Sequence, residues 1–159
     1  MAEASVASET DTFAGVLRLS RRLKAPREAV FRAFTDPVEL AKWFGPEGVE
    51  VDNVKIDLRP GGSYSVEFHE KDGQVIPLSG IYREVTPPER LVMTWTWAGT
   101  GMAGIETLVT IELSEADGET ELTLTHEKLP SQEFLDLHSQ GWTSTLNCLD
   151  RLVEQGGLS

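Results

Sequence analysis

The sequence predicts an α+β fold in which a curved antiparallel sheet of about seven strands wraps round one long C-terminal helix. Three observations predict it. Residues 131–155 have the spacing of a long amphipathic helix. Upstream of it, short alternating segments are joined by tight turns, which is typical of antiparallel strands. The sheet and the helix each have one apolar side, and packing the sheet round the helix buries both.

The first predicted elements are one strand and two short helices. Residues 13–23 alternate between apolar and polar side chains, as a half-buried strand does. Pro26 then stands at the first position of a short helix. Asp36 is the expected cap of a second short helix, which Gly45 and Pro46 end.

Six further strands follow, each bounded by turn-forming residues. They cover residues 49–58, 63–70, 75–85, 90–97, 105–113 and 120–128. In the strand expected at 75–85, the alternation allows either of two sets of residues to face inward. The competing sets are Leu78, Gly80 and Tyr82 or Ile81, Arg83 and Val85.

The long helix begins at Ser131, a good N-cap, and ends before Gly156. Six residues three or four positions apart form its apolar face: Leu135, His138, Trp142, Leu146, Leu149 and Val153. Small side chains flank this face at Gly141, Thr145 and Cys148. Such a flank indicates either close contact with the sheet or the wall of a cavity.

Length and composition set the class of protein. The 159 residues suit one domain, expected at 13–155, with a disordered tail at 1–12 and a short tail at 156–159. The net charge of -12 argues against nucleic acid as a partner, and no apolar run is long enough for membrane insertion. A single cysteine and no targeting segment predict a cytoplasmic location. Either a monomer or a homodimer is expected.

Large side chains with aromatic or apolar character fall on the sides expected to face inward. They form an ordinary core or, with a few polar groups, the wall of a ligand pocket. The candidate ligand-binding residues are Trp43, Phe44, Tyr64, Phe68, Met93, Trp95, Trp97, His126, His138 and Trp142.

Two histidines are expected to point into the same interior, His126 from a strand and His138 from the long helix. A buried histidine is either a hydrogen-bonded core residue or a group able to exchange a proton near neutral pH. In a catalytic interpretation either one is a general base and Tyr82 an acid. His69 falls on the polar side of its strand and is set aside.

No metal site or cofactor site is expected. The sequence contains no pair of cysteines and no HExxH motif. The glycine-rich segment at 99–104 joins two strands and precedes no helix, so it does not qualify as a phosphate-binding loop. Its glycines instead suggest a flexible gate at the mouth of a cavity.

Several short motifs occur in a characteristic order. They are DPVELAKWFGP at 36–46, LRPGGSY at 58–64, PPERLVMTW at 87–95, TELTLTH at 120–126 and the pair Gly141-Trp142. With the order of elements, they make residues 13–155 resemble the activator-of-heat-shock-ATPase-homolog (AHSA-like) group of the START-related helix-grip (SRPBCC) superfamily. The resemblance implies a START- or Bet v-like helix-grip fold with a deep, largely apolar cavity between sheet and helix.

Three functions are compatible with these features. The leading hypothesis is a binding protein, rather than an enzyme, that encloses a small apolar or amphipathic ligand between sheet and helix. The superfamily also includes polyketide cyclases and hydrolases, so the resemblance implies, as an alternative, an enzyme that uses the two histidines. The group's co-chaperones imply a third function, a module that interacts with a chaperone partner.

Overall fold

The computed structural model describes residues 8–13, 15–99 and 103–158. Three helices run through these residues: α1 (Arg27–Thr35), α2 (Pro37–Ala41) and α3 (Gln132–Glu154). The strands are β1 (Ser8–Phe13), β2 (Val16–Leu23), β3 (Glu50–Ile56), β4 (Ser63–His69), β5 (Val75–Thr86), β6 (Arg90–Trp97), β7 (Glu106–Ala116) and β8 (Glu119–Glu127). From β2 onward, the predicted order of strand, two short helices, six strands and long helix is confirmed.

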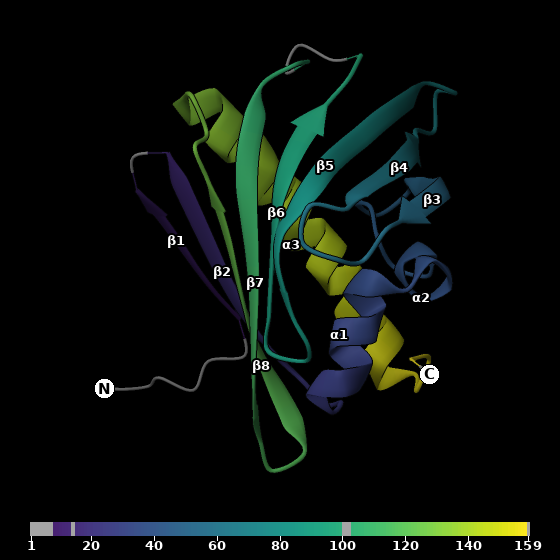
Figure 1. Ribbon diagram of the computed structural model, residues 1–159, viewed down its shortest axis with the longest axis vertical. Helices are drawn as coiled ribbons and strands as arrows, with labels where there is room; N and C mark the ends of the chain where they lie inside the picture. The colour runs from purple at the N-terminus through teal and green to yellow at the C-terminus, as the bar shows by residue number, and fades with distance from the viewer. Residues whose placement is uncertain (1–7, 14, 100–102, 159) are drawn as a thin grey trace.

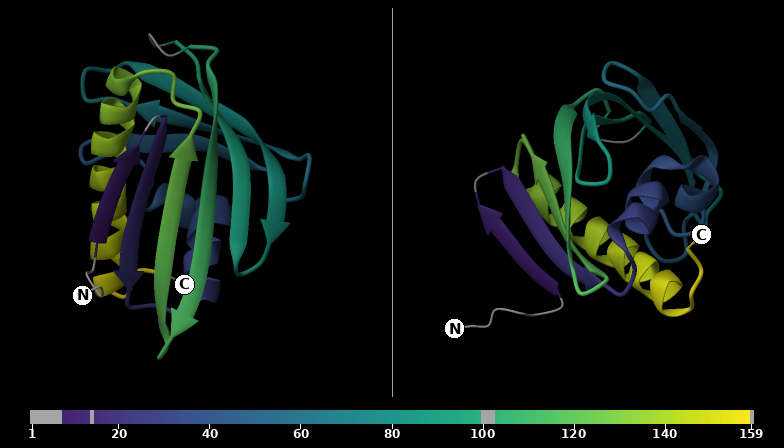
Figure 2. Two further views of the ribbon diagram at one scale, coloured as in Figure 1. Left: turned by 90° about the vertical axis from the view of Figure 1, so that its left-hand side faces the viewer. Right: turned by 60° about the horizontal axis from the view of Figure 1, so that its bottom comes forward.

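The described strands form one antiparallel sheet in the order β1-β2-β8-β7-β6-β5-β4-β3. The chain runs back and forth from β3 to β8, and β2 then pairs with β8. The sheet curves round α3, while α1 and α2 lie beside the helix at one end (Figures 1 and 2). The predicted helix-grip architecture is therefore confirmed.

The sheet has one strand more than the seven expected. Residues 8–12 were expected to belong to a disordered tail, but with Phe13 they form β1, which pairs with β2 from Ser8↔Arg21 to Phe13↔Val16. Without β1, the backbone groups on this side of β2 would be an open sheet edge, and an edge accepts an extra strand through main-chain hydrogen bonds alone. The sequence of this short polar segment has no alternation of apolar and polar residues from which β1 could be predicted.

Local chemistry sets the bounds of the helices. The Asp36 carboxylate accepts hydrogen bonds from the backbone N–H groups of Val38 and Glu39 and so caps α2. Ser131 caps α3 in the same way, accepting from Phe134 N–H. Pro26, expected as the first residue of α1, instead occupies the N-cap with extended backbone angles, so α1 begins one residue later.

The core lies between the concave side of the sheet and the apolar face of α3. All six predicted residues of that face are buried. Burying each large apolar side chain contributes about 1.5–3 kcal/mol, enough to dock the helix firmly. In β5, Leu78 and Tyr82 point inward and Ile81 is 41% exposed. The register shifts between Tyr82 and Glu84, so Val85 of the competing set also packs against the core.

Gly80, between those two inward residues, allows three strands to approach closely. A Cβ atom at this position would lie 2.0 Å from the Thr94 carbonyl oxygen in β6 and 2.6 Å from the Tyr64 ring. The Tyr64 hydroxyl donates a hydrogen bond to the same carbonyl, passing over Gly80. The absence of a side chain at Gly80 therefore lets Tyr64 of β4 reach β6.

We predict that Gly80→Ala lowers the free energy of unfolding by roughly 2–4 kcal/mol, because the new methyl group meets a backbone carbonyl that cannot turn away. Urea unfolding followed by circular dichroism measures the loss. Ser79→Ala, at the neighbouring exposed position, serves as the control and should change stability by less than about 0.5 kcal/mol. Equal effects of the two substitutions would contradict the close approach.

Candidate functional site

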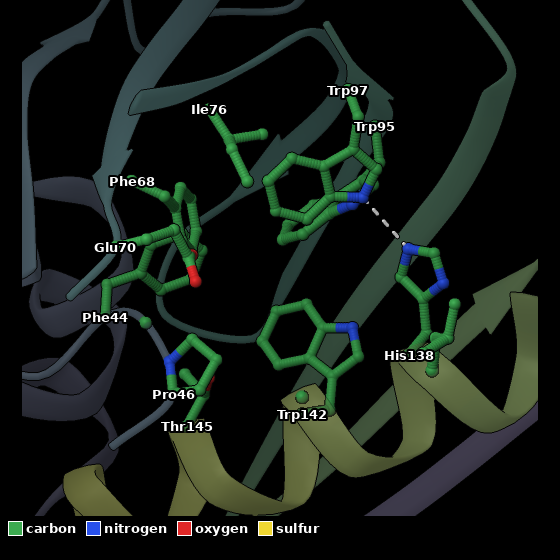
Figure 3. A pocket seen from close by; sticks show the side chains of 13 residues that line it. Phe44, Pro46, Phe68, Glu70, Ile76, Trp95, Trp97, His138, Trp142 and Thr145 are labelled. Atoms are coloured by element: carbon green, nitrogen blue, oxygen red, sulfur yellow. Dashed lines mark hydrogen bonds between the residues drawn. The ribbon is translucent and has the colours of Figure 1, made fainter. Parts of the chain in front are cut away.

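A cavity of about 340 Å³ lies between the sheet and α3. Its walls come from the loop after α2, from β4, β5 and β6, and from one side of α3 (Figure 3). The lining residues are Phe44, Gly45, Pro46, Phe68, Glu70, Ile76, Trp95, Trp97, Leu137, His138, Gly141, Trp142 and Thr145. Leu137 is 48% exposed, so the cavity reaches the surface beside α3.

Aromatic rings form most of the wall and brace one another edge to face. The Phe44 ring lies 5.6 Å from Phe68, 6.1 Å from Trp95 and 6.0 Å from Trp142, measured between centroids. The Trp97 ring stands 5.0 Å from Phe68 and 5.6 Å from Trp95. Aromatic pairs at these separations and tilts pack favourably. The rings thus support one another round the cavity without filling it.

Small side chains on α3 leave the other side of the cavity open. A Cβ atom added at Gly141 would meet nothing within 4 Å. A glycine inside a helix costs roughly 1 kcal/mol relative to alanine, so this position gives up stability without relieving a clash. The cavity-wall interpretation of the small flank therefore applies to Gly141 and Thr145, whereas Cys148 lines a separate hollow beside the loop after α2.

His138 joins α3 to β6 at one end of the cavity. The Trp97 indole N–H donates to His138 Nε2 over 3.0 Å, as the dashed line in Figure 3 shows. His138 Nδ1 lies 2.8 Å from the Phe134 carbonyl oxygen, to which only a protonated nitrogen can donate. The two contacts together require the neutral tautomer with its proton on Nδ1.

His126, in β8, has the opposite arrangement. The Trp142 indole N–H donates to His126 Nδ1 over 3.0 Å, so the proton lies on Nε2. That nitrogen donates to the Thr107 hydroxyl over 2.7 Å, and the hydroxyl donates to the Trp95 carbonyl oxygen over 3.1 Å. His126 is fully buried and does not line the cavity, so it acts by holding Trp142 in place.

Both imidazoles are held neutral. Burial lowers the pKa of His126 well below its usual value, and a charge on nearby His138 would lower it further. Burial also lowers the pKa of His138, an effect that the Phe134 carbonyl partly offsets. The two ring centroids are only 4.7 Å apart. Because every ring nitrogen already has a hydrogen-bond partner, neither histidine can accept a proton from a bound molecule unless one of these bonds breaks.

The structure brings together six of the ten residues predicted to bind a ligand. Phe44, Phe68, Trp95, Trp97, His138 and Trp142 line the cavity. The other four are His126, described above, and three residues that lie elsewhere: Trp43, Tyr64 and Met93. Trp43 donates its indole N–H to the Ala33 carbonyl in α1.

Tyr64, Met93 and the candidate acid Tyr82 lie round a second hollow of about 20 Å³, which has room for little more than one water molecule. Burial raises the pKa of both tyrosines. Tyr82 packs against Tyr64 at 5.4 Å between ring centroids and does not line the cavity beside His138. The histidine–tyrosine pair of the catalytic interpretation therefore does not assemble.

Several lining residues escaped the sequence prediction, chiefly Glu70, Ile76 and Leu137. The alternation that places Val66 and Phe68 inward continues to Glu70, so a signal for this carboxylate was present in the pattern.

Trp95 carries an unusual buried donor. Its indole N–H is sealed from solvent and has no hydrogen-bond partner among the described residues. The Trp97 indole lies in front of Trp95 in Figure 3. An unpaired buried donor costs about 1–3 kcal/mol.

A metal-binding cluster and a membrane-spanning helix are both absent from the part of the chain that the structure describes. No group of three or more histidine, cysteine, aspartate or glutamate side chains there could hold a metal ion. None of the helices has both the length and the apolar character needed to span a membrane. The gate expected at 99–104 falls partly on residues 100–102, which lie outside the described residues.

Comparison with known proteins identifies relatives. The family model described as Activator of Hsp90 ATPase homolog 1-like protein matches residues 24–154. A crystal structure of a protein from Chromobacterium violaceum is 36% identical, with a TM-score of 0.81, and the match covers 88% of this chain and 97% of that one. A protein from Nitrosomonas europaea is 30% identical, with a TM-score of 0.76 and coverage of 89% and 96%.

The AHSA1 protein from Silicibacter pomeroyi is also 30% identical, with a TM-score of 0.79 and coverage of 89% and 99%. The match with each of these three structures extends over nearly the whole of both chains. A search of curated proteins found no match. These relatives therefore support the fold and the family, and the function has to be argued from the cavity.

We predict that the free energy of unfolding falls as the pH drops below about 6.5, the ordinary pKa of histidine. There the unfolded chain takes up protons at His126 and His138, whereas the folded chain, with both pKa values lowered, does not. Stability rises with pH wherever the unfolded state binds more protons, by up to about 1.4 kcal/mol per pH unit for each histidine. Urea unfolding at about pH 7.5 and pH 5.5 measures the difference.

Replacing either histidine by glutamine should remove that residue's share of the pH dependence, whatever the variant does to stability at neutral pH. Identical pH dependence in the original protein and in both His126→Gln and His138→Gln would show that the imidazoles are not held neutral.

Proposed function

We propose that this chain, which belongs to the family of Activator of Hsp90 ATPase homolog 1-like proteins, binds a small apolar or amphipathic molecule in the cavity between its sheet and α3. The observation that carries the proposal is the unfilled, ring-walled volume of about 340 Å³. Ligand pockets typically have volumes of about 300–1,000 Å³, apolar walls and a few placed polar groups.

The lining explains how such a ligand would be held. Phe44, Phe68 and Trp142 offer ring faces and edges for an apolar body. Trp97 and His138 form one end of the site, and their mutual hydrogen bond fixes the position of both rings. A wall that is already braced loses little conformational entropy on binding, which favours affinity. Entry beside Leu137 would need no rearrangement of the sheet.

The helix glycine supports binding over simple packing. A larger residue at 141 would fill free space and improve helix propensity, yet the chain has glycine there. A binding function would account for this loss of stability, because functional sites commonly keep residues that lower the stability of the fold.

Binding also agrees better with the histidines than catalysis does. The superfamily's cyclases and hydrolases suggested a general base, but both nitrogens of His126 and of His138 are engaged in hydrogen bonds. His126 is moreover covered by other side chains. We therefore assign the histidines a positioning role. Among the described residues, no specific contact favours the third alternative, a chaperone-linked module.

The test uses N-phenyl-1-naphthylamine, a neutral fluorescent probe that brightens in apolar sites and accepts energy from tryptophan. The original protein should bind it with saturation and with loss of tryptophan emission. Gly141→Leu should weaken binding by at least about tenfold because the leucine side chain occupies the cavity. Its melting temperature should stay equal or rise, since leucine favours the helix.

Gln140→Leu places the same side chain at the adjacent exposed position and should leave probe affinity within about twofold. Equal affinity in the original protein and Gly141→Leu would show that the probe binds outside the cavity. Absence of saturable binding to the original protein, by this probe and by a panel of neutral, cationic and anionic apolar compounds, would remove the proposed function.

A further inference from the structure

We propose that the ligand of this cavity carries a positively charged amine or ammonium group, which lies at Glu70 while its apolar body lies among the aromatic rings. This inference rests on the proposed binding function and deepens it by naming the class of ligand. The cavity would then bind amines in preference to the fatty acids and other anions that an apolar cavity could otherwise accept.

The first support is the position of Glu70. It follows β4 directly, on the inward side that Val66 and Phe68 share, and it lines the cavity. Its side chain points toward the cavity beside Phe44 and Phe68 (Figure 3). The main chain there is fixed by the hairpin, since Glu70 N–H donates to the Gln74 carbonyl and Gly73 N–H donates to the Glu70 carbonyl.

The second support is the lack of a counter-charge. Over the described ranges, the Glu70 carboxylate forms no ion pair and no side-chain hydrogen bond, whereas Glu67 on the same strand contacts Asn53 and His69. The described lining contains no lysine and no arginine. Glu70 therefore supplies the only full charge of the described lining, because His138 is neutral.

The third support is the aromatic wall. A ring carries partial negative charge on its faces, so ring faces attract ammonium groups and repel anions. Phe44 and Phe68 lie next to Glu70 in Figure 3, and the Trp97 and Trp142 rings face the same space. The rings and the carboxylate thus both favour a cation over an anion. The net charge of -12 also draws cations toward the molecule.

Three matched compounds test the sign of the preferred charge. They are 4-phenylbutylamine, which is a cation at about pH 7.5, the neutral 4-phenylbutan-1-ol and the anion 4-phenylbutyrate. Dissociation constants are measured by calorimetry at low ionic strength. The amine should bind about five- to tenfold more tightly than the alcohol, as an ion pair and a cation–π contact together imply. The acid should bind more weakly than the alcohol.

Variants at Glu70 then assign the preference to this residue. Glu70→Gln should bring amine affinity close to that of the alcohol and leave alcohol affinity unchanged. Glu70→Lys should reverse the order, so that the acid binds more tightly than the amine. Glu50→Gln, on the neighbouring strand β3, makes the same charge change at an exposed residue that does not line the cavity, and it should keep the amine preference.

The outcomes separate this inference from the proposed function. Binding of the alcohol with no preference for the amine, or a preference that survives Glu70→Gln, overturns the inference and leaves the binding function standing. Binding of none of the three compounds overturns the inference, and it overturns the proposed function as well when N-phenyl-1-naphthylamine and the wider panel also fail to bind. Loss of the preference in Glu50→Gln as well as in Glu70→Gln shows a long-range charge effect and also overturns the assignment to Glu70.

Discussion

Two hydrogen bonds between indole and imidazole groups join α3 to the sheet, and the shape of the interior depends on them. In one, Trp97 of β6 donates to His138 of α3; in the other, Trp142 of α3 donates to His126 of β8. Both bonds need a neutral imidazole, and burial keeps both neutral. They fix four large rings between helix and sheet, so the helix docks firmly at Leu146, Leu149 and Val153 while space remains beside Gly141.

This arrangement connects stability with function. The cavity wall contains polar atoms whose desolvation would be costly, and those of His138, Trp97 and Trp142 are hydrogen-bonded within the protein. The Trp95 indole N–H is buried without a partner among the described residues, and the Glu70 carboxylate faces the cavity. The internal hydrogen bonds satisfy the histidines, so in the proposed function binding specificity falls to the shape of the ring wall and to Glu70.

The sequence was sufficient for the architecture because periodicity reports which side of an element is buried. It placed the apolar stripe of α3 and the inward sides of β4 and β8 correctly, and both histidines are buried as expected, although His126 does not line the cavity. Periodicity does not report the depth of a residue along the sheet, and for this reason Tyr64, Met93 and Tyr82 were grouped with a cavity that they do not reach. Glu70 was not among the predicted residues, although the alternation of β4 continues to it. Strand β1 was missed because its partner is backbone rather than apolar surface.

The most direct test of this account is the protonation of the two imidazoles, measured by long-range proton–nitrogen NMR correlation near neutral pH. The account predicts two neutral rings of opposite tautomer, with the proton on Nε2 in His126 and on Nδ1 in His138. A charged ring, or the same tautomer in both residues, would contradict it, because the indole groups of Trp97 and Trp142 could not then both donate to the sites that hold the cavity open.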